Sequence, residues 1–386
     1  MISDNNQTLT SSSSKKPSLI ENLSAKFEHL ITSLPFFAKN QPLAGIDISS
    51  TAVKLVVLGR NRSKYTIKNY AVVKLPSGAV SEKTIHQPDA VAEAIKHAIV
   101  ESGCKVTNAA IAMPNADVIS KTIQMEANLS ERELEGLVEF EAEKYIHHPM
   151  ENVSLDFHSM GKVVWNPEQI NVLLVATLTT KIADRVALAS KADINVSVVD
   201  VESNVMTNAV SLLMKQVPEH LSSGVIAVFD IGATTTTVNI MQNNVSLYSH
   251  EEAFGTAQLT TALQEEAGLS FEAAQDLQIS RGLTGFQFAK ILHTYQESLL
   301  AQLQAILQLF FSAGEYNKVD YILVSGGGSV LPDLSTFLAD KLLTPVEIAN
   351  PIKGMAIASQ IDVDLLQRDA PVLMLALGLA LRGFDI

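Results

Sequence analysis

The chain has 386 residues, a formal net charge of −13 and a hydrophobic content of 47%. A single core seldom grows beyond about 250–300 residues, so this length predicts at least two lobes. The acidic balance excludes a general nucleic-acid-binding surface and a broad basic face for anionic lipid. One cysteine excludes an intramolecular disulfide and is consistent with a reducing cytoplasm. No apolar run approaches the roughly 20 residues of a membrane span, and the polar, serine-rich start is not typical of a signal peptide.

Residues 1–40 precede the first clear strand pattern. The first 17 are low in complexity, which predicts disorder. Ser18 and Glu21 then form an S-x-x-E capping box, and apolar residues recur at spacings of three and four until Pro35. This pattern predicts an amphipathic helix that docks on a partner, a membrane or the body of this chain. Its nearly balanced charge favours a protein contact.

The stretch AGIDISSTAVKLVVL predicts a strand, a turn and a second strand. Asp47 ends the first strand, and the turn carries the hydroxyls of Ser49, Ser50 and Thr51. Lys54, further along the second strand, is expected to point away from the turn and to act only as a support residue. A third strand and a helix over 88–102 complete the part of a first lobe that we assign to residues 41–109.

Residues 110–195 are predicted to form an inserted subdomain with its own strands and two helices. The first helix is expected over 130–145 and begins with a capping box of Ser130 and Glu133. Its expected apolar face consists of Leu134, Leu137, Val138 and Phe140, and its glutamates form a solvated face. The second helix starts near Lys181.

The stretch VSVVDVESNVM predicts a strand that enters a helix, with Asp200 and Glu202 at the junction. A carboxylate at this position can orient water toward a phosphate. It can equally be a first-turn acid that complements the helix dipole. The sequence leaves both interpretations open.

The stretch FDIGATTTT repeats the pattern of the first hairpin. Asp230 matches Asp47, and Gly232, Thr234 and Thr235 follow it in the turn. Two aspartates followed by hydroxyl-bearing turns favour two jaws that close on one phosphate chain and share a divalent cation. The alternative is an ordinary hairpin with threonine as a strand former.

A glycine-rich turn follows a further apolar strand and is expected to open a helix. Gly326, Gly327 and Gly328 would let the backbone approach a ligand closely there, although the lysine of a Walker A loop is missing. Near the end of the sequence, residues 370–381 predict a buried helix with Asp369 as its N-cap and Pro371 in its first turn.

Several of these stretches together resemble the PilM family of type IV pilus assembly proteins, a branch of the superfamily of actin, Hsp70 and sugar kinases. The resemblance covers roughly residues 43–386 and rests on these blocks: GIDISSTAVKLVVL, KTIQMEANLSERELEGLVEFEAEKYIHHPMENVSLDF, VVDVES, DIGATTTTVNI, FGTAQLT, SGGGSVLPDL, EIANPIKGM and DAPVLMLALGLALR. It implies an α/β fold, the actin-like (ribonuclease H-like) two-lobed ATPase fold. An FtsA-type inserted subdomain would occupy 110–195, with the rest of the first lobe and the second lobe in 196–386.

The resemblance also implies a site for ATP and Mg²⁺. Asp47 and Asp230 would hold the metal, and Glu202 and Asp230 would be the catalytic residues. The family's A-E-x-x-K ribose motif is replaced here by residues that lack its charges, which predicts weaker nucleotide binding by about 1–3 kcal/mol for each charge-assisted bond lost. Hydrolysis stays open. The implied nucleotide-binding residues are Asp47, Ser49, Ser50, Thr51, Gly232, Thr234, Thr235, Gln275, Gln278, Gly326, Gly327 and Gly328.

By resemblance, the protein is a cytoplasmic scaffold of the pilus assembly platform at the inner face of the inner membrane. Its implied partner is the cytoplasmic N-terminal segment of PilN, alongside other inner-membrane assembly proteins. The expected groove lies around residues 119–125 and the acidic helix. The extension at 1–40 departs from the family. The alternatives are an FtsA-like cell-division membrane tether and a sugar-kinase-type phosphotransferase.

Overall fold

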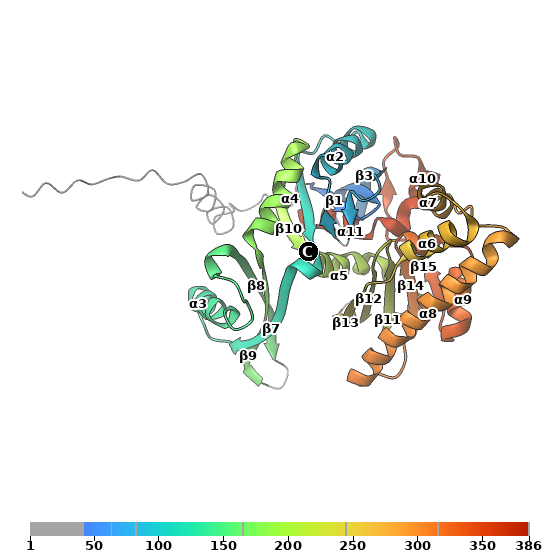
Figure 1. Cartoon of the computed structure of the whole chain (residues 1–386). Helices are drawn as coiled ribbons and strands as arrows, with labels where there is room; N and C mark the ends of the chain where they lie inside the picture. Colours follow the sequence, from blue (N-terminus) through green and yellow to red (C-terminus); the bar gives the residue numbers. More distant parts are fainter. Residues whose placement is uncertain are drawn as a thin grey trace, which may run out of the picture. The chain divides into compact units, whose positions relative to one another are not determined.

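The computed structural model describes residues 42–384 with the exception of 63, 82, 164, 165, 244 and 315. The predicted disorder and amphipathic helix at 1–40 lie outside the described residues. The described elements build three main sheets with their covering helices (Figure 1).

The first sheet has six strands in the order β10-β6-β1-β2-β3-β16. Strands β1, β2 and β3 form an antiparallel meander, and β6 and β10 continue the sheet in parallel with β1. Helices cover both faces, which explains why β1 and most of β2 are apolar runs without strict alternation. The strand bounds are β1 Ala44–Ile48, β2 Ala52–Asn61, β3 Lys64–Lys74, β6 Asn108–Met113, β10 Asn195–Val201 and β16 Ala356–Ile357.

Two helices cover one face of this sheet, α2 (Pro88–Ser102) and α4 (Thr179–Lys191). The range of α2 is the predicted one. A short hairpin, β4 (Val80–Ser81) and β5 (Thr84–Ile85), precedes α2. The opposite face packs against α10 and α11.

The chain between 363 and 381 differs from the single helix predicted over 370–381. Helix α10 (Val363–Asp369) ends where that helix was expected to start, a 3₁₀ turn (Ala370–Val372) follows, and α11 spans Met374–Leu381. The Asp369 side chain makes no capping hydrogen bond and lies 3.3 Å from Arg368. The prediction of Asp369 as the N-cap of one helix over 370–381 is wrong, because Asp369 ends α10 and its side chain does not cap the 3₁₀ turn that follows.

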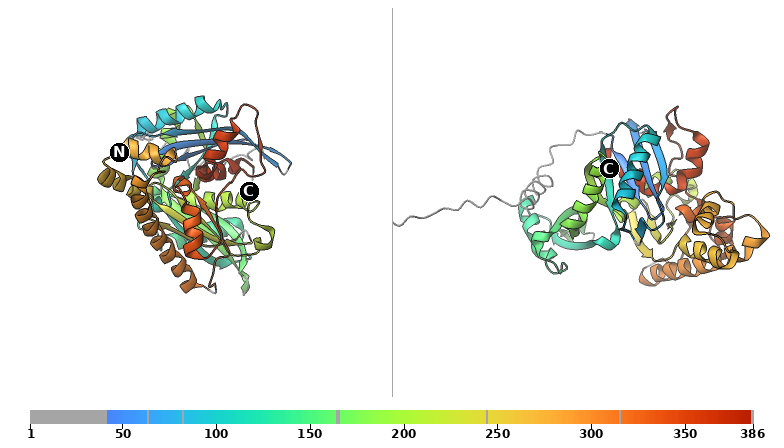
Figure 2. Two further views of the ribbon diagram at one scale, coloured as in Figure 1. Left: turned by 90° about the vertical axis from the view of Figure 1, so that its right-hand side faces the viewer. Right: turned by 45° about the horizontal axis from the view of Figure 1, so that its top comes forward.

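The second sheet has five strands in the order β13-β12-β11-β14-β15. Strands β11 and β12 form an antiparallel hairpin, and β14 pairs with β11 in parallel. Four helices gather on one face, with the long helix α8 alongside α6 (Figure 2). The bounds are β11 Ile226–Ile231, β12 Thr236–Gln242, β13 Val245–Glu252, β14 Tyr321–Ser325, β15 Val346–Ile348, α6 Thr256–Ala267, α7 Phe271–Ile279, α8 Phe286–Ala313 and α9 Leu334–Leu342.

Helices α5 (Glu202–Leu213) and α11 form a shared layer between the two sheets. Met206 and Val210 of α5 belong to the core beneath the second sheet, whereas Val205 packs with the first. Gly45 lies where α11 crosses β1, and a Cβ atom at this position would overlap the backbone of α11. Glycine is required here by this close approach.

The third sheet, β7-β9-β8, is antiparallel and has a core of its own beneath helix α3. The capping box of Ser130 and Glu133 is confirmed. The expected apolar face of α3 is partly wrong, because Leu137 and Phe140 are 44% and 63% exposed, while Val138 and Ala142 are buried. The bounds are β7 Val118–Glu126, β8 Val153–Val163, β9 Asn166–Leu178 and α3 Glu131–Ala142.

Candidate functional site

The two hairpins that the sequence singled out close with the same hydrogen bond. In the first, the Ser49 amide donates to the Ala52 carbonyl at 3.0 Å, and in the second the Gly232 amide donates to Thr235 at 2.9 Å. In each case the donor lies two residues after the aspartate and the acceptor lies three residues beyond the donor. The repeat seen in the sequence is therefore a repeat of backbone geometry.

The first hairpin carries a buried ion pair. Asp47 faces Lys54 across the β1–β2 ladder, and their side chains approach to 2.8 Å. The expectation that Lys54 points away from the turn is wrong, because the antiparallel register places it directly opposite the aspartate. The Ser49 hydroxyl donates to Ala52 at 2.9 Å, so it stabilises its own turn.

The second hairpin holds its aspartate differently. Asp230 lies beside Ser325 of β14, whose hydroxyl donates to it at 2.6 Å. Burial raises the pKa of Asp230, while the Ser325 hydrogen bond and then the charge of Lys54 work in the opposite direction. The charges of Lys54 and Asp47, which both belong to the first hairpin, therefore act on the aspartate of the second hairpin.

Both turns present polar groups to the space around them. The Thr236 hydroxyl is engaged with the Phe254 carbonyl at 2.6 Å, and the first amides of α6, from Thr256 and Ala257, donate to the carbonyls of Gly232 and Ala233. Other groups in the turns find no hydrogen-bond partner among the residues that the structure describes. They include the hydroxyls and amides of Ser50, Thr51, Thr234 and Thr235.

Glu202, the first residue of α5, forms an ion pair that the sequence did not predict. The Lys83 ammonium in the β4–β5 turn lies 2.7 Å from Glu202 and 4.0 Å from Glu251 of β13. Burial opposes the charge on Lys83, but the two glutamates hold the pKa of Lys83 above its ordinary value. Burial raises the pKa of Glu202, and Lys83 counteracts the increase. Lys83 has a φ of 65°, unusual for a lysine.

Asn115 connects this cluster to the segment that leads into the third sheet. It lies in the 3₁₀ turn η1 (Asn115–Asp117), accepts from the Ser203 amide at 3.0 Å and contacts Glu251 at 3.4 Å. The cluster thus joins the first sheet, α5 and the second sheet. Nothing in the sequence brought Lys83, Asn115 and Glu251 together, because they come from three distant segments.

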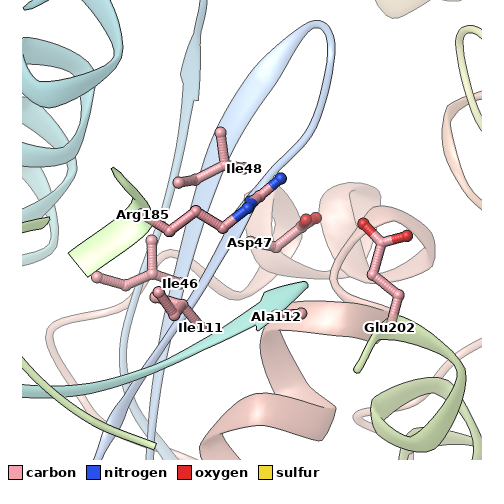
Figure 3. A pocket seen from close by; sticks show the side chains of 7 residues that line it. All are labelled: Ile46, Asp47, Ile48, Ile111, Ala112, Arg185 and Glu202. Carbon is pink, nitrogen blue, oxygen red and sulfur yellow. The ribbon is translucent and has the colours of Figure 1, made fainter. Parts of the chain in front are cut away.

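Arg185 of α4 is a second basic residue missing from the prediction. It is only 9% exposed, and its Nη2 donates to the Lys83 carbonyl at 3.4 Å. It lines a small pocket, of about 10 Å³, together with Asp47 and Glu202. Figure 3 shows its guanidinium beside Asp47, with the carboxylates of Asp47 and Glu202 turned toward the same space.

The glycine-rich turn follows β14 as predicted but leads into a 3₁₀ turn (Gly327–Val330), not directly into an α-helix. Helix α9 starts only at Leu334, so the prediction that the glycines open a helix is wrong. Gly326 has a φ of 79°, and its amide donates to the Pro371 carbonyl at 2.9 Å. A Cβ atom on Gly326 would overlap the backbone of Ile231, so the turn packs tightly behind the second jaw. Gly327 has open space around its Cα, and Gly328 packs on Ile231.

The two glutamines that were predicted to hold the ribose differ in how deeply they are buried. Gln278 is buried, and its amide donates to the Thr260 hydroxyl at 2.9 Å, so this donor serves the packing of α7 on α6. Gln275 is half-buried on the same helix. Between them, Asp276 forms an ion pair with Lys74 of β3. Gln275 is thus the more accessible of the two glutamines.

A separate groove of about 240 Å³ lies where the third sheet joins α4. Its lining is mainly apolar and includes Val118, Ile119, Ile146 and Leu178. Asp117 and Lys181 also line it and approach each other to 3.1 Å. The expected groove overlaps this one at Ile119, whereas the acidic helix α3 does not line it.

Two sheets that share a central helical layer, each with an Asp-bearing hairpin, define the actin-like ATPase class of fold. Two remote solved structures have the same fold. EutJ, an ethanolamine utilization protein from Carboxydothermus hydrogenoformans, is 12% identical, with a TM-score of 0.51 over 94% of this chain and 99% of its own. A diol dehydratase-reactivating factor is 10% identical, with a TM-score of 0.53 over 90% and 100%.

The chain belongs to the family of the type IV pilus assembly protein PilM, whose model matches residues 45–384. A solved PilM–PilN type IV pilus biogenesis complex contains a chain that is 26% identical, with a TM-score of 0.75. The match covers 90% of this chain and 100% of that one. The prediction of fold and family is confirmed. In the described part of the chain, no helix combines the length and apolar character needed to cross a membrane.

Proposed function

We propose that the protein is an actin-like, nucleotide-binding scaffold of the type IV pilus assembly platform. In this proposal it binds the cytoplasmic N-terminal segment of PilN and is held by that partner at the inner face of the inner membrane. Family membership supports the pilus role. The observation that carries the nucleotide site is the repeated hairpin geometry, with an aspartate in each hairpin and turn donors that have no partner among the described residues.

The donor chemistry of the jaws fits a polyphosphate. Backbone amides and hydroxyls in tight turns bind phosphate oxygens, and nearby cations balance the charge. Lys54 and Lys83 are the cations placed for this role, and both are paired with carboxylates. We assign phosphate binding to the two turns, 49–51 and 232–235, and base-side contacts to Gln275 and the glycine-rich turn.

The carboxylates also fit Mg²⁺, which would come with ATP. Within the described residues, no cluster of three or more His, Cys, Asp and Glu side chains is placed to hold a metal. Mg²⁺ typically binds through one or two carboxylates, waters and phosphate oxygens. Asp47 and Asp230 supply two such carboxylates, one from each jaw. When bound, the ion would neutralise phosphate charge.

Glu202 is the acid proposed to orient water at the terminal phosphate. Its ion pair with Lys83 occupies one carboxylate oxygen, Oε2. This arrangement suits a slow turnover or none, because a partner cation weakens a carboxylate as a base. The protein would then act mainly through its nucleotide state.

We assign partner binding to the segment 110–195, and within it to the groove beside Ile119. A short apolar segment of PilN would occupy the groove, with its backbone or a polar residue near Asp117 and Lys181. The groove is a concave, mainly apolar feature of this segment and borders α4, the helix leading back to the first sheet.

Calorimetric titration with ATP and Mg²⁺ tests the nucleotide site. Wild type should show saturable binding, and Asp230→Ala should weaken it by about tenfold or more, the effect of removing a charged ligand. Asp340→Ala, which changes an exposed aspartate on α9, is the matched control and should bind as wild type does. Equal binding by Asp230→Ala and wild type would contradict the proposed clamp.

Fluorescence anisotropy with a labelled peptide of the cognate PilN tail tests the groove. Ile119→Asp should lower the affinity by about tenfold or more, because it places a charge in an apolar groove. Leu137→Asp makes the same kind of change on the exposed side of α3 and should have no effect. Comparable losses in both variants, with melting temperatures near wild type, would rule out this groove.

A further inference from the structure

Arg185 has an environment that its packing does not explain. A buried guanidinium is costly unless ion pairs and several hydrogen bonds satisfy its donors. Among the described residues, Arg185 forms one hydrogen bond, a long one to the Lys83 carbonyl, and no ion pair. The three carboxylates that act on its charge, Glu202, Asp117 and Asp47, are each paired with a lysine. The guanidinium therefore lies in the pocket with donor capacity to spare.

The pocket of Arg185 adjoins the place where a terminal phosphate would lie. It is lined by Asp47 of the first jaw and Glu202 at the start of α5. Figure 3 shows the guanidinium on the side of the first hairpin and Glu202 opposite. Arginine binds phosphate oxygens through paired N–H groups, which makes it well suited to an anion arriving at this position.

Helix α4, which carries Arg185, also borders the groove beside Ile119. Lys181 precedes Arg185 by one turn of α4, so both side chains project from one side of the helix. Lys181 lines the groove and pairs with Asp117, while Arg185 lines the pocket. Asp117 shares η1 with Asn115, which contacts Ser203 and the Glu251 that lies beside Lys83.

We propose that Arg185 is a phosphate sensor that contacts the terminal phosphate of a bound nucleoside triphosphate and, through α4, makes groove affinity depend on nucleotide state. This inference rests on the proposed function. It adds a residue that distinguishes triphosphate from diphosphate and a physical route from that residue to the groove. Thermodynamic linkage requires the effect to be reciprocal, so peptide binding must change triphosphate affinity by the same factor.

The test uses the full-length protein, AMPPNP and ADP with Mg²⁺, and the labelled PilN-tail peptide. Wild type should bind AMPPNP more tightly than ADP, and peptide affinity should differ between the two complexes. In Arg185→Met we expect ADP affinity near wild type, AMPPNP affinity reduced by about tenfold to a hundredfold, and peptide affinity insensitive to nucleotide. Arg185→Lys should recover only part of the preference, because an ammonium lacks the paired donors. Lys191→Ala, an exposed change on the same helix, is the control.

The outcomes separate the two proposals. If wild type binds neither nucleotide, the proposed function fails and the sensor with it. If wild type binds nucleotide but Arg185→Met keeps the AMPPNP preference and the nucleotide-dependent peptide affinity, only the sensor is overturned. The melting temperature of the ligand-free protein adds an independent readout. Arg185→Met should melt at or above the wild-type temperature, whereas a purely structural arginine would lower it when removed.

Discussion

The two hairpins share a backbone but hold their aspartates by different means. In the first, Asp47 is neutralised by Lys54 across the ladder, and in the second Asp230 accepts a hydrogen bond from Ser325 on the neighbouring strand. Thr237 occupies the position opposite Asp230 that Lys54 occupies opposite Asp47. In the first sheet, β6 lies beside β1 as β14 lies beside β11, and Ile111 pairs with Ile46. The next residue, Ala112, corresponds in position to Ser325 but has no hydroxyl group that could donate to Asp47. The same hairpin geometry therefore holds Asp47 in an ion pair and Asp230 by a neutral hydrogen-bond donor.

This difference suggests a division of labour between the jaws. A carboxylate that already has a cation is a stable part of the fold and changes little when a ligand arrives. A buried carboxylate without a cation is destabilising by itself and gains most from a metal ion or another positive charge. We therefore expect Asp230 to contribute most to the stability gained on ligand binding. Asp47, in contrast, is expected to contribute most to the stability of the ligand-free fold.

The largest expected effect comes from removing each aspartate in the ligand-free protein. Asp47→Ala leaves Lys54, whose side chain is only 13% exposed, without its partner, so the free energy of unfolding should fall by about 3–5 kcal/mol. Asp230→Ala removes a carboxylate that burial penalises and should cost far less. Urea unfolding of both variants measures the difference. Equal losses would show that the two jaws are energetically alike, and Asp47→Asn combined with Lys54→Met should restore much of the loss.

A smaller effect is expected when the second jaw is made to resemble the first. Ser325→Ala removes the hydroxyl that donates to Asp230 and introduces the residue type found at Ala112. A hydrogen bond to a charged group contributes about 1.5–3 kcal/mol, so the free energy of unfolding should decrease by about 2 kcal/mol. The matched change Ser298→Ala, on the exposed side of α8, should cost less. No loss in Ser325→Ala would mean that Asp230 is not held by this contact.

The smallest effect is a pH dependence specific to the second jaw. Burial raises the pKa of Asp230 in the folded protein, so above the ordinary pKa of an aspartate this carboxyl group destabilises the ligand-free fold. Asp230→Asn lacks this penalty and should melt at a higher temperature than wild type at pH 7. As the pH falls through the raised pKa of the folded protein, Asp230 becomes protonated in the wild type and the difference should shrink. A difference that grows on acidification would contradict this assignment.

The sequence predicted the features that depend on local pattern. The Asp-bearing turns, the α2 range, the capping box of α3 and the strand-to-helix junction at Glu202 are all contained within short segments. The partners of those residues were not predictable, because they depend on sheet register and on contacts between distant segments. The orientation of Lys54 was predicted wrongly because the strand register was not known. Lys83 and Arg185 were missed because α4 and the β4–β5 turn come together only in the folded chain. The inward orientation of Gln278 toward Thr260 likewise depends on how α7 packs on α6.

The contact between Gly45 and α11 has a consequence for how the chain is made. Strand β1 is among the first described residues to be synthesised, and α11, which packs against it, is among the last. Because translation proceeds at about 5–20 residues per second, the face of β1 that α11 covers waits on the order of tens of seconds for its partner. During that interval the first lobe exposes apolar surface while later segments emerge. Chaperones that shield nascent chains should therefore matter more for this lobe than for the second, whose hairpin and covering helices are adjacent in sequence.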